Sequence, residues 1–411
     1  MSSKKVLFII LSDQPIPNLL SVREFKPDIV YAIVTKEMEK KGIFEVFKDQ
    51  LNNTVINKIE IDEDISNINN FKMSLKSSLE SIYQENKNNE WVINITGGTK
   101  LMSVLVNSFF ENKSMEHKIV YLPVNHNFFI DINKGDKIDV TYKLTVNEFF
   151  YVYGYECDGS QFRLDNEYSS ISTYLAKNSD VESVYEFLSD IKKIEQSKKI
   201  KIDAPLVIDE NNALSTENKE LIDFITHSPF NLVSNNYDPF KMKHILTGKL
   251  SVKNKKFLTG GWLEYFMAYV IYNLKDKLNL YDLKVNLKIT PKKIKSEEII
   301  NEIDVAFMYN QSLHIFECKT GYQKHDESGN EALYKIEAIK AGIGAIKSKI
   351  YLVTTSENIL DNSNKIKDNI KNRASLYECT IINRHDVISL ANEIENIDKL
   401  EEMMKKILKL Y

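Results

Sequence analysis

The chain has 411 residues, of which 43% are hydrophobic and 27% charged, and its formal net charge is −4. This length exceeds one compact core, so two or three domains are expected, and the charge argues against a surface built for nonspecific nucleic-acid binding. No apolar run is long enough to cross a membrane, and three distant cysteines favour neither a disulfide framework nor a zinc site. We therefore expect a cytoplasmic protein of ordinary globular composition without membrane contact.

The first 150 residues alternate apolar strands with helical segments. This βαβ pattern predicts an α/β domain with a doubly wound, Rossmann-like parallel sheet. The predicted strands are 6–11, 29–34, 55–61, 91–95, 119–123 and 128–133, and the predicted helices are 37–51 and 71–85.

A glycine-containing loop, Thr96-Gly97-Gly98-Thr99-Lys100, joins the fourth strand to a helix predicted at 101–112. Glycines allow close approach to the backbone, and a helix N-terminus offers unpaired N–H groups. The loop also follows the carboxyl end of a parallel strand, where open α/β sheets bind ligands. Its spacing fits neither a Walker A loop nor a dinucleotide-binding fingerprint. The loop therefore predicts phosphate recognition, with a tight strand–helix turn as the alternative.

Residues 151–240 are polar and contain no motif that indicates chemistry. We interpret them as a connecting region, a small helical or winged-helix-like unit. From 241 to 411 the pattern runs helix, strand, strand-turn-strand, helix, strand, helix, strand, and a closing helix predicted at 387–410. The predicted domains are therefore 1–150, 151–240 and 241–411.

Two apolar strands of the third domain carry charged residues where core residues are usual. Asp304 lies in the first strand, and Glu317 and Lys319 lie in the second, sharing a face because their spacing is two. Buried charges are unfavourable unless they are paired or bind a metal, and carboxylates suit Mg²⁺ or Mn²⁺. The alternative is a salt bridge between Glu317 and Lys319 on an edge strand.

This arrangement resembles the PD-(D/E)xK nuclease core, in which a preceding helix contributes a further acid. Glu264, in an apolar helical stretch that opens at Gly260-Gly261, takes that place. The resemblance implies a restriction-endonuclease-like α/β domain whose catalytic residues are Glu264, Asp304, Glu317 and Lys319. It also implies one or two divalent cations, Mn²⁺ or Mg²⁺, on Asp304, Glu317 and the backbone carbonyl of Cys318, with Glu264 binding directly or through water.

The N-terminal loops carry a second resemblance. Residues 95–102 resemble the nucleotide loop of CARF domains, the Rossmann-like sensors of cyclic oligoadenylates in type III CRISPR defence. Two other segments look like that family's ligand-facing loops: Ser12-Asp13-Gln14 with Pro17-Asn18 after the first strand, and Thr35-Lys36-Glu37-Met38 after the second. Together with the nuclease residues, the chain is identified as a member of the CARF–nuclease fusions, the Card/Can group. The ligand contacts that this resemblance implies are Ser12, Gln14, Thr35, Thr96, Gly97, Gly98, Thr99 and Lys100.

The same resemblance implies a homodimer that binds cyclic tetra-adenylate and thereby activates a metal-dependent endonuclease. The substrates implied are single-stranded RNA and/or DNA, with nicking of duplex DNA left open and little sequence specificity. Lysines between residues 241 and 295 could hold a phosphodiester backbone, or they could be an ordinary solvated surface.

Three other functions were weighed against this one. A ligand-responsive nucleic-acid-binding regulator without nuclease activity is the main alternative, although it gains nothing from carboxylates that face phosphate. A metal-independent HEPN ribonuclease lacks its Arg-to-His spacing here. A constitutive restriction or repair nuclease would not need the loop at Thr96.

Overall fold

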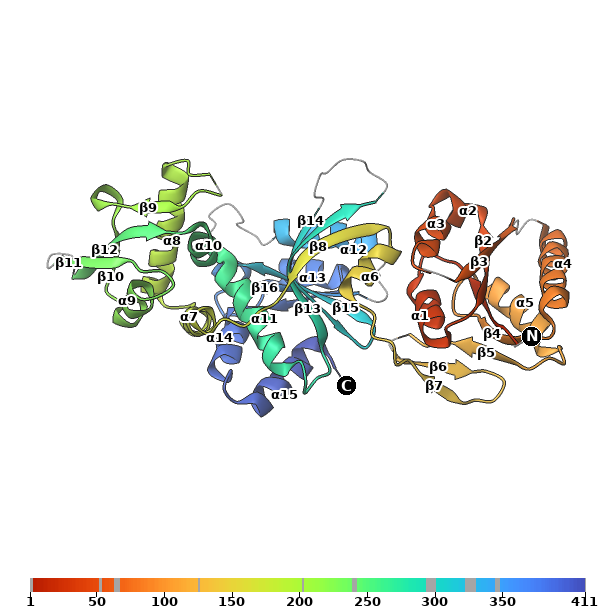
Figure 1. Cartoon of the computed structure of the whole chain (residues 1–411). Coiled ribbons are helices and arrows are strands. Elements are labelled where there is room, and N and C mark those ends of the chain that lie inside the picture. Colours follow the sequence, from red (N-terminus) through yellow and green to blue (C-terminus); the bar gives the residue numbers. More distant parts are fainter. Residues whose placement is uncertain are drawn as a thin grey trace.

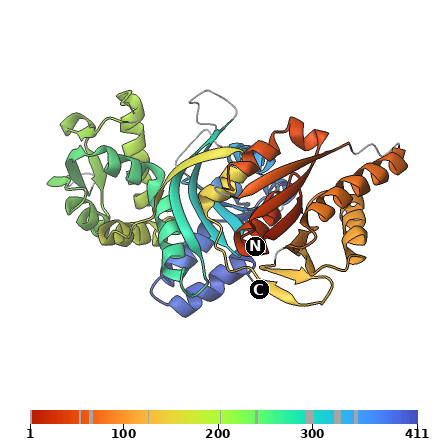
Figure 2. The same cartoon turned by 45° about the vertical axis from the view of Figure 1, so that its right-hand side comes forward.

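The computed structural model describes residues 3–51, 54–62, 67–124, 126–201, 203–238, 242–292, 301–321, 330–343 and 348–410. Within them, three sheets of seven, four and six strands organise the chain. Figure 1 shows the parts in a row, with the six-stranded sheet between the other two. The turned view in Figure 2 keeps the same order.

The N-terminal sheet has the strand order β3-β2-β1-β4-β5-β6-β7. It is parallel from β3 to β5 and antiparallel from β5 to β7. Its strands are β1 (Lys5–Ile10), β2 (Ile29–Thr35), β3 (Val55–Ile61), β4 (Glu90–Asn94), β5 (His117–Tyr121), β6 (Phe128–Asp131) and β7 (Lys137–Asp139). Its helices are α1 (Ile16–Phe25), α2 (Lys36–Lys40), α3 (Ile43–Lys48), α4 (Ile68–Asn86), α5 (Lys100–Glu111) and α6 (Val146–Val152).

Both faces of this sheet are covered, which explains why its strands are continuous apolar runs. Phe8 and Ile10 of β1 pack with α4 and α5, whereas Leu7 and Ile9 pack with α1, α3 and α6. The second cluster continues without interruption into the six-stranded sheet. The N-terminal and C-terminal domains therefore share apolar core.

The middle unit combines helices with a small antiparallel sheet. In that sheet β12 lies between β10 and β11 and also pairs with β9. Its elements are α7 (Asn166–Lys177), α8 (Glu182–Ser197), β9 (Leu206–Ile208), η2 (Glu210–Asn212), β10 (Leu214–Thr216), α9 (Lys219–Thr226), β11 (Val233–Asp238), β12 (Lys243–Leu250) and α10 (Val252–Lys256).

The C-terminal sheet has the order β17-β16-β15-β14-β13-β8. Strands β15, β16 and β17 are parallel, and the pairs from β15 to β8 are antiparallel. Helices α11, α14 and α15 cover one face, and α12 and α13 cover the other. The elements are β8 (Tyr155–Gln161), the π-helical segment η3 (Phe257–Gly261), α11 (Trp262–Leu274), β13 (Tyr281–Pro291), β14 (Asn301–Tyr309), β15 (Ser312–Lys319), α12 (Asn330–Ile343), β16 (Ser348–Thr354), η5 (Glu357–Ile359), α13 (Asp368–Leu376), β17 (Cys379–Ile382), α14 (Arg384–Asn392) and α15 (Ile397–Leu408).

The turn between β14 and β15 is held by the chain that leaves the N-terminal domain. Gln311 in this turn is only 2% exposed, and its backbone φ is +61°. Its side chain accepts a hydrogen bond from the Leu144 N–H at 3.0 Å and donates one to the Tyr142 carbonyl oxygen. A buried amide with these partners fixes the end of the hairpin to the domain junction.

The predicted fold class is confirmed, since an N-terminal parallel sheet precedes a mixed α/β domain. Several predicted elements differ in detail. The predicted helix 37–51 is two short helices around a left-handed Gly42, and the predicted helix 387–410 is interrupted between α14 and α15. The pairing of β8 with β13 also places residues 155–161 in the C-terminal sheet rather than in the connecting region.

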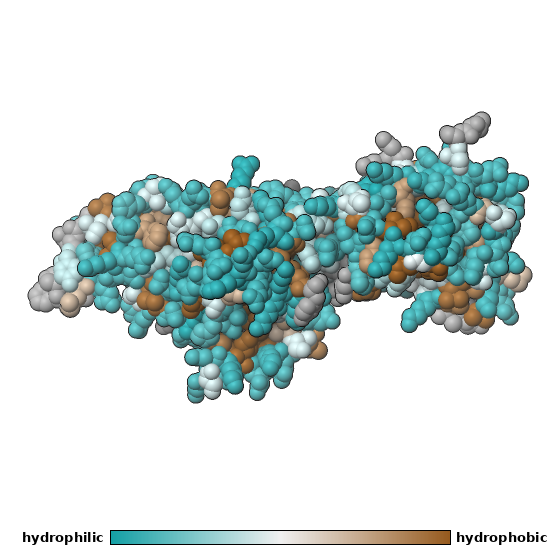
Figure 3. All heavy atoms as spheres, turned by 90° about the horizontal axis from the view of Figure 1, so that it is seen from below, coloured by the Kyte–Doolittle hydropathy of each residue, from teal (hydrophilic) through white to brown (hydrophobic). Residues whose placement is uncertain are grey.

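Hydrophilic side chains cover most of the face seen in Figure 3, with smaller hydrophobic patches between them. No helix in the described ranges is long and apolar enough to cross a membrane. Cys157, Cys318 and Cys379 carry free thiols.

Candidate active site and candidate ligand-binding loops

The β14–β15 hairpin brings Asp304 and Glu317 together. Val305 pairs with Phe316 in the antiparallel register, so the neighbouring residues Asp304 and Glu317 stand opposite each other. Asp304 is 9% exposed and Glu317 is fully buried. The Asp304 carboxylate accepts a 2.6 Å hydrogen bond from the Cys318 N–H. The predicted alternation is also present, because Leu313 and Ile315 enter one core whereas Phe316 and Cys318 enter the other.

Two lysines neutralise the buried Glu317 carboxylate. Lys319 lies 2.9 Å from its Oε1, as the two-residue spacing in the strand predicts. Lys335 of α12 contacts both oxygens, at 2.8 and 2.6 Å. The Glu317–Lys319 salt bridge therefore exists, but it lies in an interior strand and includes a second lysine, which excludes the edge-strand alternative.

Glu264 lies in the first turn of α11, directly after the π-helical segment η3. Insertions of this type inside helices are frequent at functional sites. Burial raises the pKa of Glu264 to about 7; Lys319 opposes this rise and Glu317 adds to it. The cluster predicted from sequence is therefore assembled from three elements, α11, β14 and β15.

The pKa values of the cluster residues reflect how closely their charged groups are packed. Burial, and then the Glu317 charge, raises the pKa of Asp304 well above its usual range. Burial by itself lowers the pKa of Lys319, but the Glu317 and Asp304 carboxylates raise it above its ordinary value. Such groups stabilise a cation, because an added positive charge would relieve the repulsion between the carboxylates.

Lys335 and Lys192 are two cations of the site that the sequence analysis missed. Burial lowers the pKa of Lys192 on α8, and the nearby Lys319 charge lowers it further, which places the middle unit beside the cluster. Neither lysine lies in a strand of the acidic motif, and lysine is abundant throughout the chain, so no sequence signal distinguished them. Lys335 therefore contacts a carboxylate of the cluster directly, and Lys192 lies within electrostatic range of Lys319.

Glu264, Asp304 and Glu317 all offer carboxylate oxygens, which are the ligands that a hard divalent cation prefers. Among the described residues, no three His, Cys, Asp or Glu side chains are grouped as a ready metal site. In this structure Glu317 is bound to two ammonium groups and Asp304 to a backbone N–H. A cation that enters would take the place of the Lys335 ammonium group on Glu317.

The predicted ligand loops meet at one edge of the N-terminal sheet. Strands β2, β1 and β4 are adjacent and parallel, so the residues that follow their carboxyl ends lie side by side. Thr35 ends β2, Ser12 and Gln14 follow β1, and the glycine loop follows β4. This is the edge where open α/β sheets bind ligands.

Some of these side chains stabilise the loops through hydrogen bonds within the chain. The Thr96 hydroxyl donates to Asn94 Oδ1 at 2.6 Å and accepts from the Leu122 N–H at 2.8 Å. Thr35 and Thr99 cap the N-termini of α2 and α5. Gly98, Thr99 and Lys100 are exposed, so they are the part of the loop that a ligand can reach.

The two glycines are required by space and backbone conformation. A Cβ atom at Gly97 would lie 2.1 Å from the Ile10 carbonyl oxygen, and one at Gly98 would lie 2.3 Å from Ile10 Cγ2. Gly98 also has a φ of +77°, which strains other residues. Close packing against β1 therefore explains both glycines, and it leaves the outer side of the loop open.

Half of the described lysines of the predicted basic stretch are paired with carboxylates. Lys255 is 1% exposed and lies 2.8 Å from Glu195. Lys243, Lys256 and Lys292 have partners at 3.1 to 3.5 Å. Lys241, Lys293 and Lys295 lie outside the described residues. Half of the described stretch is therefore an ion-paired surface, whereas Lys335 contacts the Glu317 carboxylate directly.

Two family models match the chain. Residues 6–149 match the Card1 CARF domain, and residues 252–396 match the Card1-like endonuclease domain. The protein thus combines a CARF domain with an endonuclease domain. It belongs to the Card1-like CARF nucleases.

Solved structures show the same fold over nearly the whole chain. Can2 from Sulfobacillus thermosulfidooxidans, in complex with cyclic tetra-adenylate, is 18% identical with a TM-score of 0.69, over 95% of this chain and 96% of that one. Protein VC1899 from Vibrio cholerae is 17% identical with a TM-score of 0.74, over 96% of this chain and 98% of that one. No curated protein matches the chain in sequence.

Proposed function

We propose that this protein is a metal-dependent endonuclease that cyclic tetra-adenylate activates in type III CRISPR defence. The observation that carries the proposal is the buried cluster of Asp304 and Glu317 with its lysines, reached by Glu264 from α11. A domain that only bound nucleic acid would gain nothing from carboxylates at this position, because they repel phosphate. The match to a Card1-like endonuclease domain supports the same conclusion.

Asp304 and Glu317 would hold one or two divalent cations, Mn²⁺ or Mg²⁺, with Glu264 and the Cys318 carbonyl completing the set. Such a cation polarises the scissile phosphate and lowers the pKa of a bound water. Lys319, anchored by Glu317, would orient the attacking water and neutralise charge that develops on the phosphate oxygens. Lys192 and Lys335 would attract the phosphodiester backbone toward the acidic residues.

The activator would bind across a homodimer at the edge formed by Ser12, Gln14, Thr35 and the loop from Thr96 to Lys100. Two copies related by a two-fold axis would offer equivalent loops to a cyclic ligand. The CARF match and the cyclic tetra-adenylate in the similar Can2 structure support this choice of ligand. The ligand must bind the active arrangement more tightly than the inactive one in order to activate it.

The proposed substrates are single-stranded RNA and/or DNA, with duplex nicking as a further possibility to test. Purified protein is incubated with Mn²⁺ and labelled RNA, single-stranded DNA and supercoiled plasmid, with and without cyclic tetra-adenylate. Cleavage that requires both additions is expected. If the activator binds but no substrate is cut, the protein is instead a ligand-responsive nucleic-acid-binding regulator.

Point variants separate the two sites. Asp304→Ala and Lys319→Ala should abolish cleavage and keep the affinity for cyclic tetra-adenylate, whereas Lys100→Ala should lose that affinity and, with it, the activated cleavage. Glu402→Ala, an exposed acid on α15, is the matched control and should change neither. Loss of activator binding in the Asp304 variant would contradict the two-site model.

A further inference from the structure

A cavity lies at the end of the C-terminal sheet opposite to the acidic cluster. It has a volume of about 840 Å³ and is lined by the starts of β15, β16 and β17 together with α13 and the chain after α15. In the parallel register Ser348 of β16 stands beside Leu313, whereas Glu317 stands beside Leu352. Four residues of extended strand, roughly 13 Å, therefore separate the cavity from the acidic cluster.

Three lysines give the cavity a positive rim. Lys349, Lys371 and Lys409 line it and are exposed, and none forms an ion pair with a described carboxylate. Among the described residues of the lining, Glu378 is the one acid, and it is bound to Lys340 at 2.8 Å. Since the negative charge is already neutralised, the lysines create an unbalanced positive field in the cavity.

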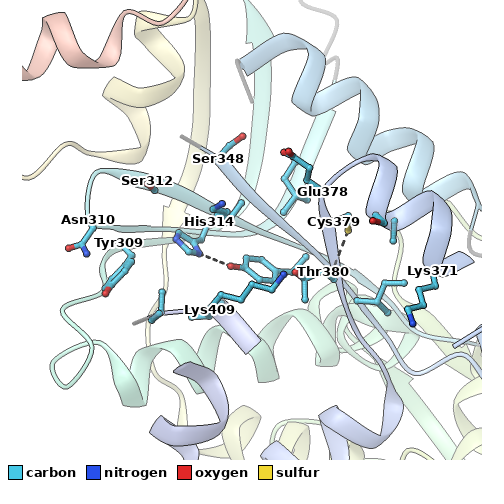
Figure 4. Close-up of a pocket in the computed structure, with 18 of the residues that line it drawn as sticks. Tyr309, Asn310, Ser312, His314, Ser348, Lys371, Glu378, Cys379, Thr380 and Lys409 are labelled. Carbon is cyan, nitrogen blue, oxygen red and sulfur yellow. Dashed lines mark hydrogen bonds between the residues drawn. The ribbon is translucent and has the colours of Figure 1, made fainter. Parts of the chain in front are cut away.

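The inner wall offers polar groups that are buried. Ser348 is 3% exposed, and its hydroxyl has no hydrogen-bond partner among the described residues. His314 is 2% exposed and lies 3.1 Å from the Tyr351 hydroxyl through Nδ1. Figure 4 shows Ser348, His314 and Lys409 around the hollow, with the dashed bond from His314. A buried hydroxyl without a partner is unfavourable, so an acceptor that entered the cavity would stabilise it.

We propose that this cavity is a binding site for a small phosphorylated ligand of about nucleotide size. Pockets for such ligands measure roughly 300–1,000 Å³ and combine apolar walls with a few polar groups. The lysines would contact the phosphate, Ser348 would donate a hydrogen bond to it, and Tyr309 and Tyr351 would provide aromatic walls. This site is independent of the proposed nuclease and sensor functions.

The test uses the full chain in EDTA, titrated calorimetrically with uridine monophosphate. Binding is expected with a stoichiometry of one per chain and a dissociation constant below about 1 mM, and uridine should bind at least tenfold more weakly. Inorganic phosphate forms a third arm. If it binds as tightly as uridine monophosphate, the site takes free phosphate; if it binds more weakly, the site takes a nucleotide. Either result preserves the phosphate chemistry of the proposal.

Charge reversal locates the site. The double variant Lys371→Glu/Lys409→Glu should weaken binding of uridine monophosphate at least tenfold, and Ser348→Ala should weaken it several-fold. The double variant Lys100→Glu/Lys177→Glu, at two exposed lysines away from the cavity, reverses the same number of charges and controls for net charge. Lys100→Glu alone controls for binding at the CARF loop. Unchanged binding in Lys371→Glu/Lys409→Glu, loss of binding in Lys100→Glu, or absence of binding in the unmodified protein would each overturn the proposal.

Discussion

The pair formed by Lys335 and Glu317 makes a prediction that can be quantified. Glu317 is fully buried and contacts two ammonium groups, and the Lys335 side chain is 27% exposed. Replacement of Lys335 by methionine keeps the packing of the stem and removes one counter-charge. Removing one partner of a fully buried pair costs about 3–5 kcal/mol. Because Lys319 remains in place and Lys335 is partly solvated, we expect a loss of about 2 kcal/mol.

Thermal unfolding in EDTA measures this loss. For a domain of this size, about 2 kcal/mol corresponds to a decrease in Tm of roughly 4–8 °C. Saturating Mn²⁺ should reduce the difference in Tm between the variant and the unmodified protein, because the metal would then be the counter-charge of Glu317. The control is Lys405→Met on α15, which removes an exposed pair with Glu401 and should change Tm by less than about 2 °C.

Two results would refute the reasoning. If Lys335→Met is as stable as the control, Glu317 does not depend on Lys335 for its charge balance. If the gap in Tm is the same with and without Mn²⁺, the lysine and the metal do not share the Glu317 carboxylate.

Three further variants test other parts of the structure. Burial lowers the pKa of His314 to about 3, below its ordinary 6.5, so the unfolded chain binds the extra proton first as the pH falls. Above pH 6.5 the neutral His314 costs the protein no stability, and the free energy of unfolding should decrease by about 2 kcal/mol between pH 6.5 and 5. Urea titrations over this pH range should find no such decrease in His314→Gln. Gly98→Ala should lower Tm and activator affinity through the clash with β1, by about 2–4 kcal/mol in stability, whereas Gly135→Ala, which has the same φ of +77° but open space, should lose only about 1 kcal/mol. Gln311→Ala should destabilise by about 1–3 kcal/mol because a buried backbone N–H loses its acceptor. Asn310→Ala in the same turn, exposed but with a φ of +44° that favours Asn over Ala, should lose only about 1 kcal/mol in the same assay.

The acidic cluster could be predicted from the sequence because three of the residues that form it are close together in the chain. Asp304, Glu317 and Lys319 lie on two neighbouring strands, and the two-residue periodicity of a strand determines which of them share a face. Lys335 comes from a helix that crosses the sheet, and only the tertiary packing of α12 brings its ammonium to Glu317. No periodicity in the sequence contains that information.

The start of α1 illustrates a second limit. Pro17 and Asn18 resemble loop residues, and the sequence analysis grouped them with the ligand-facing segment. They lie instead inside α1, where proline is tolerated in the first turn. Asn18 is fully buried and donates a 2.8 Å hydrogen bond to the Ile10 carbonyl oxygen. An asparagine looks the same in the sequence whether it lies in a loop or forms a buried hydrogen bond between two elements. The sequence therefore could not distinguish the two roles.

The β14–β15 hairpin is constrained at both of its ends, which limits how its length can vary. Gln311 at the turn is bonded to the chain that leaves the N-terminal domain, and Asp304 and Glu317 face each other nearer the other end. One residue inserted between Gln311 and Glu317 would turn Glu317 and Lys319 toward the core that holds Phe316. Two inserted residues would restore the face but displace Glu317 by roughly 7 Å relative to the turn and to Asp304. Insertions in proteins that share this architecture should therefore occur in the other connections and leave this hairpin at constant length.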